Sequence, residues 1–144
     1  KAVWIENEKM PFRCQGRDPE VAPRDDEYTG EGSSLSGFGR PEPDDPNRRK
    51  IVWVEAIDFS EFLDSQKYSY EEVVVKMDIE GSEVTVLEHC IGRGTAGLID
   101  SLFVEFHVRF QKKLLGLNRD EVIQKEADLT KRFSKHIGRV EQWR

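Results

Sequence analysis

The sequence predicts an α/β domain with a mostly parallel sheet and flanking helices. Two segments rich in β-branched and aromatic residues, 51–57 and 71–77, are typical of strands. A helical period of apolar residues follows the second segment, and another strand-like segment covers residues 101–106. Such alternation of strands and helices is characteristic of α/β folds. The 144 residues are enough for one domain with a hydrophobic core, so residues 1–144 are interpreted as a single domain.

The beginning of the chain predicts one more short strand. "AVWI" at residues 2–5 has strand composition, and residues 7–9 are expected to turn the chain. After the aromatic-rich strand further along, Asp58 or Ser60 can cap a short helix that ends near Leu63.

The run "VVVKM" at residues 73–77 is almost continuously apolar. This composition predicts a central parallel strand that is covered on both faces. A helical stripe follows, formed by Val84, Leu87 and Ile91. The glycines within residues 92–94 predict the end of this helix. Residues 73–107 therefore have the length of one strand–helix–strand unit with a parallel crossover.

The last third of the chain predicts a long amphipathic helix. Asn118 and Glu121 have the spacing of a capping box at its start. Its apolar face is expected to consist of Val122, Ile123, Leu129, Phe133 and Ile137. Gly138 predicts its end, and "RVEQW" at residues 139–143 has the composition of a further strand.

Residues 15–50 form a long polar segment that is rich in Gly, Pro, Ser, Asp and Glu. Few of its side chains could anchor it to a core. A loop of this length is unusual inside a compact domain and is normally either functional or mobile. We expect a partly mobile loop here.

Charge and cysteine content exclude several classes of protein. The net charge of −6 argues against a protein that binds the nucleic acid backbone. No apolar run approaches the roughly 18 residues of a membrane span, and no signal-peptide pattern is present. Cys14 and Cys90 fit neither a metal-ligand spacing nor a disulfide framework. Two free thiols in a reducing compartment are therefore expected, and with them a cytoplasmic location; a single bridge between the two is the alternative.

Acidic side chains and one histidine follow two strands of the predicted sheet. Asp78 and Glu80 come directly after the first, and Glu105 and His107 have the same spacing at the end of the next. Residues two apart in an extended chain point to one side. Strands joined by one crossover are usually neighbours, and ligands bind beyond the carboxyl ends of such strands. Because crowded carboxylates raise one another's pKa, a general base for neutral pH is expected at this rim.

The same residues also fit a purely structural interpretation. Asp78 could cap the following helix, and Glu80 could face water. Glu105 could pair with Lys76 on the neighbouring strand, and His107 could be a hydrogen-bonded histidine at the rim. A short string of acids and a glycine matches many unrelated sequences by accident, so both interpretations stay open on spacing alone.

"VVVKMDIEGSEVTVLE" at residues 73–88, followed by "LFVEFH" at 102–107, resembles the FkbM-like family of class I S-adenosylmethionine-dependent methyltransferases. In that family a strand ends in a Lys–x–Asp–x–Glu–Gly run, a helix follows, and the next strand ends in Glu–x–His. Three weaker matches occur in the family's order: "KAVWIENEKMPF", "GSSL" and "VEAIDFSEFL". The resemblance covers residues 1 to about 110 and is most specific at 76–87.

The resemblance implies an O-methyltransferase that moves a methyl group from S-adenosylmethionine to a hydroxyl of a sugar or another small metabolite. Asp78 is then the candidate closest to the reacting hydroxyl, as general base or metal ligand, and Glu80 and His107 would orient the acceptor. Three further residues are expected to contact the acceptor, namely Glu105, Ser33 and Ser34. The resemblance leaves the need for a divalent metal open, and no metal ligands are assigned, because an imidazole suits an all-oxygen Mg²⁺ site poorly.

The match departs from the family in one respect. A class I methyltransferase holds its cofactor with a glycine-rich turn after the first strand and an acid after the second, and the sequence has neither. "GRGTAG" at residues 92–97 precedes a strand instead of following one. The fold is therefore expected to be a partial Rossmann-like class I methyltransferase fold without its N-terminal cofactor-binding strands. The start at Lys1 instead of Met leads us to expect that these strands lie upstream, and that this chain alone binds the cofactor poorly.

Two hypotheses from different classes remain. The chain is either the acceptor-side half of such an enzyme or a non-catalytic, methyltransferase-derived subunit whose open sheet is covered by a protein partner. Trp4, Trp53 and Trp143 are the contact candidates for the second hypothesis, although core positions are favoured for each. A hydrolase is disfavoured because no nucleophile elbow surrounds Ser82.

Overall fold

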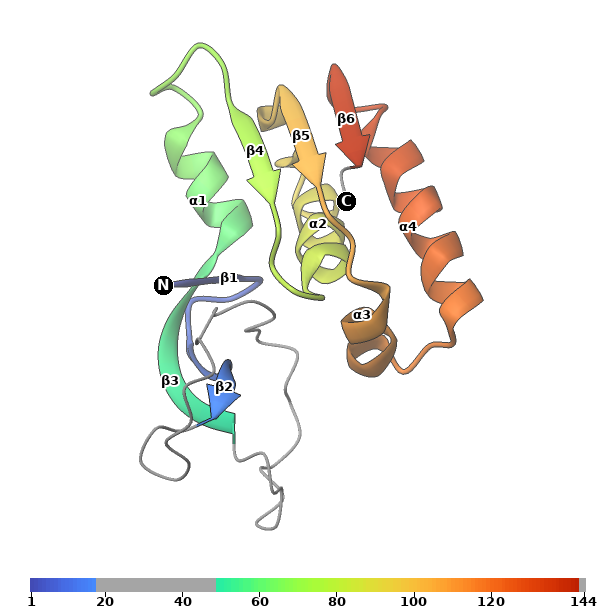
Figure 1. The fold of residues 1–144 in the computed structure, drawn as a ribbon. Coiled ribbons are helices and arrows are strands. Elements are labelled where there is room, and N and C mark those ends of the chain that lie inside the picture. Colours follow the sequence, from blue (N-terminus) through green and yellow to red (C-terminus); the bar gives the residue numbers. More distant parts are fainter. Residues whose placement is uncertain (18–48, 143–144) are drawn as a thin grey trace.

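The computed structural model describes residues 1–17 and 49–142, and these form an α/β structure with two three-stranded sheets. One sheet is entirely parallel, with the order β4-β5-β6. Its strands are β4 (Val74–Met77), β5 (Ser101–Val104) and β6 (Arg139–Gln142). All three run in the same direction, so their carboxyl ends lie at one edge of the sheet (Figure 1). The predicted α/β class and parallel sheet are confirmed at this level.

The second sheet is mixed and has the order β1-β3-β2. Its strands are β1 (Ala2–Trp4), β2 (Lys9–Arg17) and β3 (Arg49–Asp58). β1 is parallel to β3, whereas β2 is antiparallel to it. The antiparallel pair was not expected, because the residues after Phe12 are polar and do not have the composition of a strand. They pair with β3, which is distant in the sequence. The predicted loop at 15–50 is thus shorter at both ends, and residues 18–48 lie outside the described residues.

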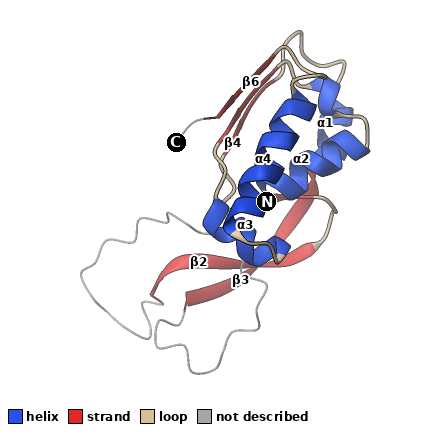
Figure 2. Ribbon diagram, turned by 90° about the vertical axis from the view of Figure 1, so that its right-hand side faces the viewer, coloured by secondary structure: helices blue, strands red, loops and turns tan. Residues whose placement is uncertain are grey.

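Helices cover one face of the parallel sheet, as Figure 2 shows. The helices are α1 (Phe59–Gln66), α2 (Glu83–Gly92), α3 (Val108–Leu115) and α4 (Arg119–Phe133), with a short 3-10 turn at Ala96–Leu98. α2 connects β4 to β5 as the predicted crossover, and α4 connects to β6. α3 was not predicted; it has only eight residues, about two turns, and a helix this short is a weak signal without its tertiary contacts.

The main hydrophobic core lies between α2, α4 and the parallel sheet. α2 contributes the largest share, with Val84, Val86, Leu87 and Cys90 fully buried. β5 supplies Leu102 and Val104, and α4 supplies Leu129 and Phe133. α2 is therefore buried over a wider arc than the single predicted stripe, because it packs between the sheet, α1 and α4.

Two helix starts follow the predicted capping chemistry. Asp58 is the N-cap of α1, and its Oδ1 accepts the backbone N–H of Glu61 at 3.1 Å. Asn118 and Glu121 form the complete capping box of α4, with bonds of 3.0 and 2.7 Å. Each cap satisfies amide groups that have no partner inside the helix, so local sequence fixes where these helices begin.

Several expectations are corrected by the tertiary arrangement. β4 is an edge strand of the described sheet instead of a central one, and the side chain of Val74 is 55% exposed. The continuous apolar run misled because one face of β4 has no cover among the described residues. α4 ends at Phe133 instead of near Gly138, and Ile123 is exposed. Ile137 is buried beyond the end of the helix.

The tryptophans also depart in part from expectation. Trp53 on β3 is 70% exposed instead of buried in a core. Trp4 packs partly buried against the core, as favoured, and Trp143 lies outside the described residues.

Candidate functional site

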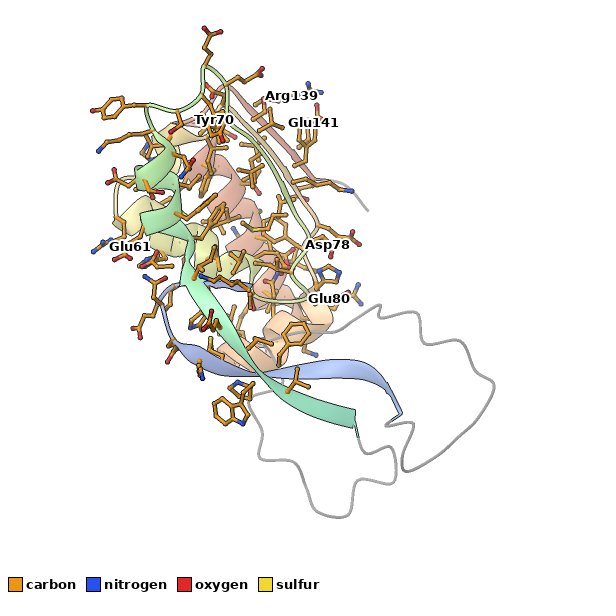
Figure 3. All side chains as sticks on the ribbon, turned by 90° about the vertical axis from the view of Figure 1, so that its left-hand side faces the viewer. Glu61, Tyr70, Asp78, Glu80, Arg139 and Glu141 are labelled. Carbon is orange, nitrogen blue, oxygen red and sulfur yellow. The ribbon has the colours of Figure 1, made fainter. Side chains whose placement is uncertain are left out.

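The turn between β4 and α2 places two acidic side chains at the carboxyl end of the parallel sheet. Asp78 and Glu80 both lie on this turn (Figure 3). Glu80 has a φ of 53° and Gly81 a φ of 104°, both in the left-handed region. Glycine adopts such a conformation without steric cost, whereas a glutamate there costs on the order of 1 kcal/mol. The surrounding contacts must hold the turn in this shape.

Glu83, the first residue of α2, supplies those contacts. Its side chain is completely buried. Its Oε1 accepts the backbone N–H of Ile79 at 3.2 Å, and both of its oxygens accept the N–H of Gly81 at 3.0 and 3.1 Å. A carboxylate at the first turn of a helix is also favoured by the helix dipole. Glu83 therefore binds the backbone of the turn from inside.

The same carboxylate reaches across to the end of β5. His107 Nδ1 donates to Glu83 Oε1 at 2.9 Å, and Gln111 Nε2 donates to Glu83 Oε2 at 3.0 Å. His107 is the N-cap residue of α3, and Gln111 lies one turn further along that helix. One buried side chain thus joins the β4–α2 turn to the β5–α3 segment and fixes the orientation of the imidazole.

The other imidazole nitrogen faces three carboxylates from two strand ends. His107 Nε2 lies 3.5 Å from Glu80 Oε2, 3.7 Å from Asp78 Oδ1 and 3.8 Å from Glu105 Oε1. The side chains are 18% exposed for His107 and 44% exposed for Asp78, so the cluster is partly open to solvent. The predicted convergence of Asp78, Glu80, Glu105 and His107 at one edge of the sheet is confirmed.

The charges around His107 hold it in the protonated state. The hydrogen bond to Glu83 is the largest influence on its pKa; burial opposes it, and the charges of Glu83, Glu80 and Asp78 reinforce it. Together they raise the pKa of His107 from 6.5 to about 9. At neutral pH the imidazole is therefore a cation that can donate a proton.

Glu83 responds in the opposite direction. Burial by itself raises its pKa, but the hydrogen bonds from His107 and from the Gly81 backbone outweigh burial, and the pKa is lowered below 4.5. The pair is thus a buried carboxylate with a partly exposed imidazolium. A positive imidazolium held among carboxylates offsets their mutual repulsion.

Two parts of the structural interpretation do not hold. Asp78 does not cap α2, since Ser82 occupies the N-cap position and forms no side-chain capping bond. Glu80 does not simply face water, because its side chain is only 19% exposed and lies against His107. The other predicted contact residues, Ser33 and Ser34, lie outside the described residues.

Two residues of the site were missed as site residues by sequence reasoning, Glu83 and Gln111. A signal for Glu83 existed, because Glu83, Leu87 and Cys90 share one helical stripe and all three are buried. A charged residue on a buried stripe normally has charged or polar partners. Gln111 had no comparable signal, since α3 itself was not predicted.

The donor set of the cluster suits a divalent cation. Asp78, Glu105 and His107 each offer one ligand atom, and these atoms all lie within 4.8 Å of one another. Oxygen and imidazole ligands together are typical of first-row transition ions. The glycines of 92–97 lie between α2 and β5, ahead of a strand, as the sequence indicated.

No family model, curated protein or solved structure matches the chain. Within residues 1–17 and 49–142, none of the helices is both long enough and apolar enough to cross a membrane.

Proposed function

We propose that the chain is the acceptor-side half of an FkbM-like, S-adenosylmethionine-dependent O-methyltransferase that acts on a hydroxyl of a sugar or another small metabolite. The observation that carries this proposal is the meeting of three carboxylates around His107 Nε2, at 3.5 to 3.8 Å, where two neighbouring parallel strands end. These residues are the ones in the Asp–x–Glu–Gly and Glu–x–His motifs that resemble the family. Strand carboxyl ends are also where open α/β sheets bind ligands.

In this proposal the chain's own residues bind and orient the acceptor. Asp78 is the most exposed member of the cluster and would accept the proton that the reacting hydroxyl loses. Glu80 and Glu105 would accept hydrogen bonds from other hydroxyls of the acceptor, which a sugar supplies in number. His107, held by Glu83, would keep these carboxylates in place as a cation.

S-adenosylmethionine would supply an electrophilic methyl group on its sulfonium. The sequence has no glycine-rich turn after a first strand and no acid after a second, so no residue of this chain is assigned to its binding. A cytoplasmic setting belongs to the same proposal and is supported by the free, buried thiol of Cys90.

The test is a methyl-transfer assay on the full-length protein with labelled S-adenosylmethionine and a panel of sugars and small hydroxylated metabolites. Asp78→Asn keeps the size of the side chain but removes its basicity, and it should lower kcat by about 10²- to 10⁴-fold. Asp64→Asn is the matched control, since Asp64 is an exposed carboxylate on α1 that pairs only locally with Lys67. Full turnover by Asp78→Asn, or no transfer by the wild-type protein to any acceptor, contradicts the proposal.

A non-catalytic subunit is the second candidate, and specific exposed apolar side chains favour it. Trp53 is 70% exposed on β3 and Val74 is 55% exposed on β4, positions at which a protein partner could cover the sheets. This candidate predicts that the full-length protein does not bind S-adenosylmethionine in calorimetric titration. It also predicts that Trp53→Ser weakens binding of the partner without changing the fold.

A further inference from the structure

The ligand atoms of Asp78, Glu105 and His107 are spaced as they would be around one ion. A first-row divalent ion lies about 2.0–2.2 Å from its ligands, so two ligands on opposite sides are about 4.0–4.4 Å apart. The three atoms already lie within 4.8 Å of one another. Rotation of the partly exposed carboxylates of Asp78 and Glu105 would close the remaining difference. Asp78 and Glu105 come from different strand ends, so the spacing is set by the sheet and not by one loop.

The imidazole is oriented as a metal-binding histidine is. His107 Nδ1 is held by the fully buried Glu83, which leaves Nε2 as the atom that faces the carboxylates. Carboxylate–histidine pairs of this kind fix the ring and raise its basicity as a ligand in many metal sites. Gln111 holds the second oxygen of Glu83, so the orienting carboxylate is itself immobilised.

The polar groups around the cluster are not all satisfied by protein atoms. Ser82 Oγ, in the turn beside Glu83, and Gln111 Oε1, on the amide that donates to Glu83, are buried and have no hydrogen-bond partner among the described residues. Buried polar atoms without a protein partner commonly mark a place for an ordered water or a ligand. They lie in the two segments that converge on the cluster.

The charge of the cluster also fits a dication. Asp78, Glu80 and Glu105 carry three negative charges, and the His107 imidazolium among them carries one positive charge. A divalent ion in place of the imidazole proton would balance more of this charge than the proton does. Glu80, with its oxygen 3.5 Å from His107 Nε2, would lie beside the ion and complete its polar surroundings.

We propose that Asp78, Glu105 and His107 Nε2 bind one divalent cation of the Mn²⁺ type at the carboxyl edge of the parallel sheet. Mn²⁺ accepts both carboxylate oxygens and imidazole nitrogens, whereas Mg²⁺ and Ca²⁺ prefer oxygen alone. This inference does not depend on the proposed methyl transfer, because binding of the ion is measured without any acceptor or cofactor.

The experiment is a titration of the metal-free protein with MnCl₂, in which the electron paramagnetic resonance signal of free Mn²⁺ reports binding. The wild-type protein should bind one Mn²⁺ per chain, and Mg²⁺ should compete only at higher concentration. Asp78→Asn and Glu105→Gln should each weaken Mn²⁺ binding at least about tenfold. Asp64→Asn removes an exposed carboxylate on α1 and should leave binding unchanged.

His107→Gln should weaken binding by a similar factor, and circular dichroism checks that this variant is folded. If it unfolds, Asp78→Asn decides the outcome, because Asp78 is 44% exposed and makes no helix cap. The proposal is overturned if the wild-type protein binds no Mn²⁺ up to millimolar concentration, or if Asp78→Asn binds as tightly as the wild type. Activity lost together with unchanged Mn²⁺ binding in Asp78→Asn would contradict the ion site and leave the methyl-transfer proposal intact.

Discussion

Two histidine–carboxylate pairs in this protein have similar geometry and different surroundings. His89 Nε2 on α2 donates to both oxygens of Asp58 at 3.0 and 3.1 Å, and Asp58 is buried at the end of β3. His107 donates to the buried Glu83 at 2.9 Å. Both bonds tie together elements that are distant in the sequence. A bond between a histidine and a buried carboxylate is therefore a common structural link and does not identify a site.

The difference lies in what else surrounds each ring. In the described part of the chain, Asp58 is the one carboxylate within ion-pair distance of His89. Asp58 is also occupied as the cap of α1, and its backbone N–H donates to Asn7 Oδ1. Around His107 three additional, partly exposed carboxylates gather. Additional carboxylates that are partly open to solvent, and not the buried bond itself, distinguish the candidate site from the structural pair.

The largest effect is expected from removing the anchor of the His107 region. Glu83→Ala removes the acceptor of His107, of Gln111 and of the turn backbone, and it leaves an imidazolium without its buried partner. We expect the free energy of unfolding to fall by about 3–5 kcal/mol. Urea unfolding followed by circular dichroism measures it. A loss below 1 kcal/mol would show that the turn is held by other contacts.

Stability should also depend on pH through His107. Its pKa is raised in the folded protein to about 9, from 6.5, so its contribution is fully present below pH 6.5 and is lost as the pH rises through 9. The pKa of Glu83 is lowered, so its contribution is present above pH 4.5 and is lost below that value. The pair therefore contributes most between pH 4.5 and 6.5.

The loss on the alkaline side should be at most about 3 kcal/mol. Urea unfolding in the presence of a chelator, at pH values from 6 to 10, measures it, and His107→Gln should remove most of the alkaline slope. An unchanged slope in that variant would assign the titration to other groups.

A smaller effect is expected at the structural pair. Asp58→Asn keeps a good helix cap but removes the charge that His89 contacts. We expect a loss of about 1–2 kcal/mol in the free energy of unfolding. Asp58→Ala, which also removes the cap, should cost about 1 kcal/mol more. If the two variants are equally stable, the cap contributes nothing and the comparison of the two pairs must be revised.

The smallest effect separates the two histidines by function. His89→Gln should leave Mn²⁺ binding and methyl transfer unchanged, since His89 lies in the last turn of α2 and Glu83, which holds His107, lies in its first turn. His107→Gln should weaken both. The same paramagnetic resonance titration and transfer assay serve both variants. A similar loss of Mn²⁺ binding in His89→Gln would mean that the binding is not located at His107.

The convergence of the candidate site was predictable because it follows from regular geometry. One parallel crossover makes the strands that end at Met77 and Val104 neighbours. The strand period of two does not extend to the cluster, since Glu80 lies on a turn with a φ of 53° and His107 is the N-cap of α3. The caps of α1 and α4 were equally predictable, since each depends on residues within three positions of one another. Local rules of this kind hold wherever the chain adopts the expected element.

The remaining features depend on contacts between distant segments. The pairing of β2 with β3 came from a neighbour that no local pattern indicates. α3 has only eight residues and packs against α4. The apolar run of β4 suggested a buried strand. Among the described residues β4 pairs with β5 on one side only, so it lies at the edge of the sheet and Val74 is exposed.

The sequence by itself determined the α/β class, the crossover and which charged residues meet, because periodicity and strand order require no knowledge of packing. Only the tertiary structure decided that Glu83 is buried in contact with His107 and that His107 is a cation at neutral pH. The physical reason is that protonation depends on burial and on charges within a few ångströms, and these distances exist only once both strand ends are folded side by side.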